Sequence, residues 1–540
     1  MELHFADHVV LVAYLAAMMF LGWRLARGQK TEEEYFLGGR RLPWFAVGVS
    51  IIASLLSSIT YLASPGIVWR FGFGAFVSNL VAIPIDIVLI LLLAIPFFVR
   101  FKFTTAYEYL EHRYNLSVRL LGATMFLIFV TVLMGVIVLV SSRALAVATG
   151  LPLVVVIGVI GVVATVYTMM GGIRAVVWTD VIQAALLVGG GLFAIGYVAY
   201  TTGSGPLDWY HVVSARDNES FTFFSPDPTQ AGTVVTMTLS AVIWTLTAHC
   251  ANQMTLQRYF STVDVRAAKR SFVTSIVVSI TISFLLAVIG ASLVYYYTQG
   301  PAVLPEHFDL ASGKDRDAIF PFFVASRIPP GLAGAIFAAL LAAAMSTIDS
   351  GVNSWATVAT VDFGRLRKKP STGNRVFQAR VITLIVGLVV TVSAIYLDGV
   401  TGMDDILTIL PKTFNSLVGS MGALFLAGML FPRVSSRAVW PAAFIGLAVA
   451  LGVAYSRDLL QLMDPSTHQA MAGVLGADFT QRLVEKGMGF TWIILLSAIA
   501  ALGSAWLLSF VFPNKDLDRI KGLTWATRHE PSPFTRKKLV

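Results

Sequence analysis

The sequence predicts an all-α, polytopic membrane protein with about 13 transmembrane helices, its N-terminus outside the membrane and its C-terminus inside. Of its 540 residues, 56% are hydrophobic and only 13% are charged. This balance excludes an ordinary soluble protein, because apolar segments long enough to cross a bilayer recur along the whole chain. The distribution of lysine and arginine among the loops gives the predicted orientation.

The predicted spans are apolar runs of about 20 to 30 residues, separated by polar loops. They cover approximately residues 7–26, 43–67, 74–99, 119–148, 151–170, 174–201, 232–258, 270–298, 331–362, 374–400, 404–431, 436–456 and 489–512. The loops between them are too short for a soluble catalytic domain. No GxxxxGK(S/T) phosphate-binding motif occurs in the chain.

The basic residues agree with this count of spans. Most of the 39 lysines and arginines fall in loops that are predicted to lie inside, as the positive-inside rule requires for an odd number of helices. The net charge of +9 therefore reflects membrane topology, and it does not call for nucleic acid as a partner. We expect the protein in the plasma (inner) membrane, surrounded by lipid and working as a monomer.

Small and polar residues interrupt two of the predicted spans. The second span contains SIIASLLSSITYLASPG, residues Ser50–Gly66, and the seventh contains TLTAHCANQ, residues Thr245–Gln253. Interrupted helices that open two five-helix units are typical of inverted-repeat transporters, whose solute and ion sites lie at the breaks. The alternative is a pair of unrelated kinks at proline, glycine and serine.

The repeat hypothesis divides the chain into two five-helix units with peripheral helices on either side. Its parts are a first helix and cytoplasmic loop at 1–42, a first repeat at 43–201, an extracellular loop at 202–231, a second repeat at 232–431, two peripheral helices with an extracellular loop at 432–512, and a cytoplasmic tail at 513–540.

A stripe of small and hydroxyl residues follows one face of the ninth predicted span. Its members recur at the spacing of one helix face, and they are Ala343, Ser346, Thr347, Ser350 and Ser354. Aligned hydroxyls, together with carbonyls freed at a broken neighbouring helix, suit a small hard cation such as Na⁺. The alternative is that these hydroxyls only hydrogen-bond to neighbouring helices or to their own backbone.

Four motifs resemble those of the sodium/solute symporter family. They are EYFLGGRRLPWFAVGVSIIAS (Glu34–Ser54), MGGIRAVVWTDVIQ (Met170–Gln183), NQMTLQRYFS (Asn252–Ser261) and AAAMSTIDSGVNSWATVATVD (Ala342–Asp362). The family includes galactose, proline, sialic acid, monocarboxylate and multivitamin symporters. The resemblance implies a LeuT-like fold of five plus five inverted helices, with Na⁺ as the coupling ion and a small organic solute as the transported partner.

The resemblance also implies a first sodium site at the break of the second span. Its ligands would be the backbone carbonyls of Ala53, Leu56 and Ala343 with the hydroxyls of Ser346 and Thr347. This set agrees with the hydroxyl stripe, because carbonyls at a helix break need not be consumed by amides one turn later.

A second sodium site depends on residues of the sixth and ninth spans. Family members with two sodium ions use an aspartate that matches Asp180 and two hydroxyls, one of which matches Ser350, whereas Asp349 stands at the other position. Asp349 therefore leaves three roles open: a ligand of a second cation, a proton acceptor, or a partner of a basic group. Asp180 also has an alternative role as an interfacial acid near Arg174.

The solute site is the least defined part of the sequence. The resemblance places solute contacts at Leu55, Thr60, Asn79, Thr245, Ala248, His249 and Lys412. Sugar-transporting relatives have glutamine, glutamate and asparagine where Thr60, Asn79 and Thr245 stand, so their sugar-binding set is not retained. Lys412 would attract a carboxylate if it faces the cavity. Alternatively, it pairs with Asp404 or Asp405 at the outer end of its span.

These observations favour a sodium-coupled secondary transporter, with a slight preference for a carboxylate or other organic anion as solute. A sodium/sugar symporter is the nearest alternative. An ion channel has no use for two paired interrupted helices, and a transporter-like sensor would need a signalling domain. An enzyme is not expected, because the chain has no HExxH or GxSxG motif.

Overall fold

The computed structural model describes residues 3–216, 222–230, 232–305, 308, 318–366, 375–400 and 403–531. The side chains at positions 75, 400, 403–411, 413 and 414 are outside the description. Within these ranges the secondary structure is helical, apart from one isolated antiparallel bridge between Val434 and Pro513. The predicted all-α class is therefore confirmed.

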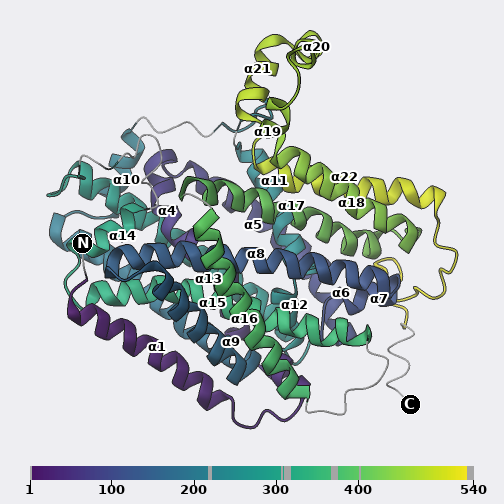
Figure 1. The fold of residues 1–540 in the computed structure, drawn as a ribbon, viewed down its shortest axis with the longest axis horizontal. Coiled ribbons are helices and arrows are strands. Elements are labelled where there is room, and N and C mark those ends of the chain that lie inside the picture. The colour runs from purple at the N-terminus through teal and green to yellow at the C-terminus, as the bar shows by residue number, and fades with distance from the viewer. Residues whose placement is uncertain are drawn as a thin grey trace. The chain divides into compact units, whose positions relative to one another are not determined.

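The long helices occur in the order that the hydropathy pattern predicts (Figure 1). They are α1 (Phe5–Leu25), α3 (Trp44–Leu55), α4 (Ser58–Phe71), α5 (Gly74–Leu89), α8 (Leu116–Thr149), α9 (Leu153–Thr202), α11 (Val234–Cys250), α13 (Val265–Thr298), α15 (Leu332–Val361), α16 (Arg375–Val400), α17 (Met403–Leu430), α18 (Ser436–Ala454) and α22 (Thr491–Val511). Shorter helices are α2 (Glu32–Leu37), α6 (Ile95–Phe98), α7 (Glu108–Arg113), α10 (Pro206–Ala215), α12 (Gln253–Phe260), α14 (Ile319–Arg327), α19 (Ser456–Gln461), α20 (Pro465–Leu475) and α21 (Ala477–Lys486).

Nine helices of the described residues are long and apolar enough to cross a membrane, or up to eleven if each of two bent pairs is one span. The bent pairs are α3 with α4, at 67°, and α11 with α12, at 50°. These are the two spans in which the sequence predicts interruptions. At 50 residues, α9 is too long for one crossing, and Gly172 within it has the non-helical φ of 53°. The total of 13 spans remains a prediction.

The chain forms two compact units, made of residues 1–76, 133–220 and 257–404, and of residues 77–132, 221–256 and 405–540. In the first unit α15 contacts α1, α3, α9 and α16. Its most apolar stretch of 18 residues is 89% buried, more than that of the other long apolar helices among the described residues. A helix that is enclosed on all sides can present hydroxyl groups without exposing them to lipid.

The start of α15 is fixed by the first helix. The Asp7 carboxylate of α1 accepts hydrogen bonds from the backbone N–H groups of Gly331 and Gly334, each over 2.7 Å. These are amides of the first turn that have no partner within the helix, and the negative charge also opposes the positive end of the helix dipole. Asp7 therefore holds α1 against the N-terminus of α15.

Helices α9 and α16 approach each other through two reciprocal glycine–threonine contacts. A side-chain carbon added at Gly161 would collide with Thr391, and one added at Gly387 would collide with Thr165. Small residues four apart on both helices allow this close packing, as in many helix pairs within membranes. These contacts join two of the helices that pack against α15.

In the second unit α18 packs along α22, and α11 also contacts α22. The Arg113 guanidinium of α7 donates hydrogen bonds to the carbonyls of Gly428 and Phe431, at the end of α17. It thereby satisfies carbonyls that lack a partner within the helix. The chain beyond α22 folds back in the same unit, where the Tyr109 hydroxyl donates to the Leu523 carbonyl.

Candidate functional site

The break between α3 and α4 exposes backbone carbonyls at the predicted sodium site. Helix α3 ends at Leu55, Leu56 has an extended conformation (φ −84°, ψ 104°), and α4 begins at Ser58. Carbonyl groups in the last turn of α3 therefore lack the amide partner that a continuous helix would provide. The sequence SLLSS produces this break without proline or glycine.

The hydroxyl stripe of α15 meets this break. The Ser346 hydroxyl lies 2.9 Å from the Ala53 carbonyl oxygen and 3.1 Å from the Ala343 carbonyl oxygen. The Thr347 hydroxyl lies 3.5 Å from the same Ala343 oxygen. Four of the five predicted ligands thus lie together, and Leu56 is at the break itself. Carbonyl and hydroxyl oxygens at a helix break suit Na⁺, so the residues present fit the ion that the resemblance implies.

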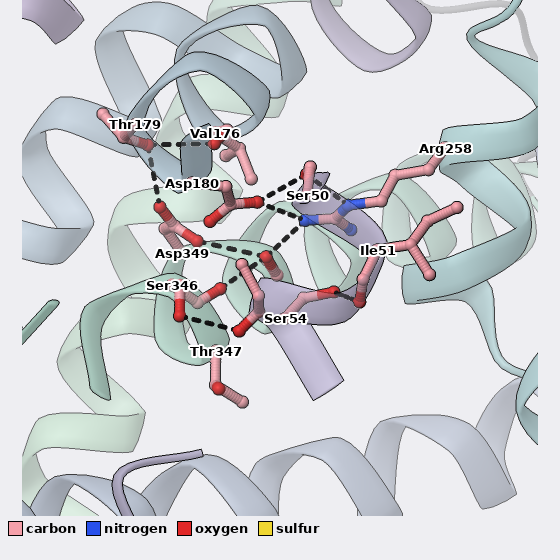
Figure 2. Close-up of polar contacts among 12 residues, drawn as sticks. Ser50, Ile51, Ser54, Val176, Thr179, Asp180, Arg258, Ser346, Thr347 and Asp349 are labelled. Atoms are coloured by element: carbon pink, nitrogen blue, oxygen red, sulfur yellow. Dashed lines mark hydrogen bonds and ion pairs between the residues drawn. The ribbon is translucent and has the colours of Figure 1, made fainter. Parts of the chain in front are cut away.

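A buried ion pair lies beside this site (Figure 2). The Arg258 guanidinium of α12 is 3.0 Å from the Asp180 carboxylate of α9, and both side chains are 0% exposed. The same guanidinium donates to the hydroxyls of Ser50, over 2.7 Å, and Ser350, over 2.5 Å. The Ser50 hydroxyl in turn donates to Asp180 over 2.5 Å. Asp180 is therefore neutralised from within the protein rather than exposed at an interface.

The second acid of this region, Asp349, is also fully buried. It accepts hydrogen bonds from the hydroxyls of Tyr167, over 2.7 Å, Thr179, over 3.3 Å, and Ser350, over 3.1 Å. Neutral donors hold this carboxylate, whereas the guanidinium contacts Asp180. The buried cluster thus contains two acids and one base, and with all three ionised it carries one net negative charge.

The stripe of α15 serves more than one purpose. Ser346 and Thr347 lie at the break, Ser350 contacts Arg258, and the Ser354 hydroxyl donates to the Gln257 amide oxygen over 3.0 Å. Cation ligation and helix-to-helix hydrogen bonding are therefore both compatible with the stripe, in successive turns. The sequence pattern alone does not show which turns face the proposed cation site and which turns bond to neighbouring helices.

The sequence analysis did not identify Arg258, Ser50 or Tyr167 as site residues. Arg258 lies inside the NQMTLQRYFS motif, and it is completely buried. The signal in the sequence is the position of Arg258 after the break of the seventh span. An arginine inside a membrane-spanning segment is costly unless it faces the protein interior and pairs with an acid.

The predicted solute residues are distributed over both units. In the first unit, Leu55 and Thr60 flank the break and are half-buried. In the second unit, Asn79 is exposed and Thr245 is half-buried, while Ala248 and His249 are buried near the end of α11.

Lys412 has an acidic partner in the second unit. Its ammonium lies 3.7 Å from the Asp458 carboxylate of α19 and 5.4 Å from the centre of the Tyr455 ring. The lysine side chain is 31% exposed. The predicted partners Asp404 and Asp405 have side chains outside the described part of the chain. The observed pair resembles the predicted contact at the outer end of the span, but with a different acid.

Comparison with known proteins decides the family. The profile of the sodium:solute symporter family matches residues 35–448. The chain belongs to this family. The sodium/sialic acid symporter SiaT of Proteus mirabilis (strain HI4320) is 32% identical over 475 residues, which are 85% of this chain and 92% of SiaT. The sodium/sialic acid symporter NanT of Aliivibrio fischeri is 30% identical over 462 residues, which are 84% of this chain and 88% of NanT.

Solved structures confirm the fold of this symporter. A Na⁺-coupled sialic acid symporter in a substrate-bound, outward-open state matches with a TM-score of 0.79 and 26% identity, over 95% of this chain and 99% of that one. The nucleobase-cation-symport-1 transporter Mhp1 shares the fold at a TM-score of 0.51 and 14% identity, over 92% of this chain and all of its own. The predicted LeuT-like class, the predicted sodium coupling and the integral membrane location are thereby confirmed.

Proposed function

We propose that the sodium ion that drives solute uptake binds at the break after α3. The ion would be held by the carbonyls of Ala53, Leu56 and Ala343 and by the hydroxyls of Ser346 and Thr347. The contact between Ser346 and Ala53 carries the proposal, because it brings a hydroxyl of α15 to a carbonyl of α3 at the break. An ion bound there links the two helices, and its release allows them to separate.

Alternating access follows from this link. Sodium enters from outside and favours the outward-open form, solute then binds near the break, and closure permits release of both to the inside. One positive charge that crosses 100 mV contributes about 2.3 kcal/mol, enough for roughly fiftyfold accumulation before the sodium gradient is added. The proposed process is transport without chemical change of the solute, and we expect one chain to carry it out.

A second cation is proposed near Asp349 rather than at Asp180. The Asp180 oxygen Oδ2 and the Ser350 hydroxyl already contact Arg258. Asp349 contributes a negative charge for which the cluster has no second base. A buried carboxylate without a counter-cation is costly, so one further monovalent cation would stabilise the cluster.

The solute proposed from the relatives is a small organic acid. Sialic acid is named for two relatives that are 32% and 30% identical, and a sodium-coupled monocarboxylate transporter of Xenopus laevis is 28% identical over 84% of this chain. Lys412 gives no support for an acidic solute, since its ammonium already has an acidic partner. A sugar remains the second candidate, because a sodium/glucose cotransporter of Vibrio parahaemolyticus is 27% identical over 88% of this chain.

Uptake by purified protein in proteoliposomes tests the proposal. Sialic acid, lactate, glucose and alanine would each be offered with an inward sodium gradient, and with choline in place of sodium. The proposal predicts saturable accumulation of at least one solute that collapses when the gradient is dissipated. Ion flux that does not saturate and needs no solute would instead indicate a channel.

A further inference from the structure

Helix α5 carries an acid that the sodium site does not use. The face of this segment that packs against protein repeats every four residues and consists of Ser78, Ala82, Asp86, Ile90 and Ala94, all of them buried. Asp86 is only 6% exposed. A carboxylate in the middle of an apolar span is expensive, and such residues face a partner or a pathway.

Asp86 faces α11, the broken helix of the second unit. The Thr238 hydroxyl of α11 donates to the Ser78 carbonyl over 3.2 Å, and the Thr245 side chain lies close to the Asp86 carboxylate. These contacts advance by two turns on both helices, so α5 and α11 lie side by side and run in the same direction. Asp86 thereby meets one of the residues that the sequence predicts to contact solute.

The carboxylate has unused binding capacity. Its oxygen Oδ1 is buried and has no hydrogen-bond partner among the described residues. Thr245 is a neutral donor, and no basic side chain in the described part of the chain acts on Asp86. A threonine hydroxyl leaves the charge of a buried carboxylate uncompensated. A group that brings both a positive charge and hydrogen-bond donors would satisfy this oxygen.

We propose that Asp86, together with Thr245, binds a cationic nitrogen of the transported solute. An ammonium group offers three donors and a full positive charge, and the solute is the mobile group that reaches a transport pathway. This inference rests on the proposed function, and it narrows the solute class. If the solute also carries the carboxylate expected from the relatives, it is a zwitterion of the amino-acid type.

Paired solutes that differ only at the nitrogen provide the test. Alanine and lactate share a carbon skeleton and differ in ammonium against hydroxyl, and glucosamine and glucose differ in the same way. Thermal stabilisation of the detergent-purified protein, with sodium present, measures binding without requiring transport. Sodium-driven uptake in proteoliposomes measures the same preference during turnover.

The variants are Asp86→Asn, which keeps the shape and removes the charge, and Asp86→Ser, which serves if the first does not fold. Ser78→Ala is the matched control, since it changes a buried polar residue two turns away on the same face. We expect the wild type and Ser78→Ala to prefer the amine of at least one pair, and Asp86→Asn to lose that preference by about tenfold to a hundredfold. The sodium dependence of uptake should not change.

The proposal is overturned if neither amine binds better than its hydroxyl partner to the wild type, or if Asp86→Asn and Asp86→Ser keep the preference. The second outcome would mean that Asp86 only joins α5 to α11. Amine binding that depends on Asp86, without any sodium-driven uptake, would support this inference and count against the proposed function instead.

Discussion

The Ser346 side chain of α15 lies 2.9 Å from the backbone carbonyl oxygen of Ala53, in the last turn of α3. These residues are 293 positions apart in the sequence. The contact is possible because α3 ends two residues later, which leaves this turn without its usual amide partners. An ion that needs both oxygens can therefore bind only while α3 and α15 are in contact.

Replacement of Thr347 by alanine should raise the sodium concentration for half-maximal uptake by about tenfold or more. The change removes one oxygen from the proposed ion site and leaves the backbone ligands in place. Solute affinity at saturating sodium should change much less, because the hydroxyl is not proposed to contact solute. Uptake measured over a series of sodium concentrations gives both quantities.

Ser354→Ala is the control for this experiment. Ser354 belongs to the same stripe, but its hydroxyl contacts Gln257, so its loss should leave the sodium requirement near that of the wild type. An unchanged sodium requirement in Thr347→Ala would remove this residue from the proposed site. An equal rise in both variants would mean that the helix, rather than the ligand, was affected.

The sequence predicts the helix break and the hydroxyl stripe of the proposed sodium site better than the residues that surround them. The break at Leu56 and the hydroxyls of α15 are local patterns, and the family motifs link them. The pair of Asp180 and Arg258 is different, since its two residues are 78 positions apart and no local pattern matches one to the other. The partner of Lys412 was missed for the same reason, because Asp458 lies in a predicted outer loop whose folding depends on tertiary contacts.

Asp180→Asn should lower the free energy of unfolding by about 3–5 kcal/mol. The variant leaves the Arg258 guanidinium completely buried without the carboxylate that contacts it directly, because the hydroxyls of Tyr167, Thr179 and Ser350 hold Asp349. The double variant Asp180→Asn with Arg258→Gln should recover only part of this loss, since it removes the unpaired guanidinium but also the base that acts on Asp349. Thermal unfolding of purified proteins measures the effect, and a single variant as stable as the wild type would show that the pair contributes little.

A second cation near Asp349 predicts sigmoidal dependence of uptake on sodium. Asp349→Asn removes the charge that is not matched by Arg258, so uptake in this variant should become hyperbolic while the first site survives. Tyr167→Phe removes a donor to the same carboxylate but keeps its charge, and should remain sigmoidal. A Hill coefficient near one in the wild type would argue directly against a second sodium ion.

Lys412→Gln should change uptake of both an acid and a neutral analogue by less than about tenfold. The lysine is partly exposed and pairs with Asp458, so the substitution breaks a solvent-screened contact. Asp458→Asn breaks the same pair from the other side and should have an effect of similar size. A strong loss that is specific for the acid, seen only in Lys412→Gln, would show that the ammonium contacts solute.

Binding of radioactive sodium to the purified protein, compared between the wild type and Ser346→Ala, tests the central claim most directly. Sodium coupling through the junction of α3 and α15 predicts saturable binding to the wild type and an affinity lower by about tenfold or more in the variant. Both proteins would first be shown to unfold at similar temperatures. Equal sodium affinity in the two proteins would contradict the proposed site.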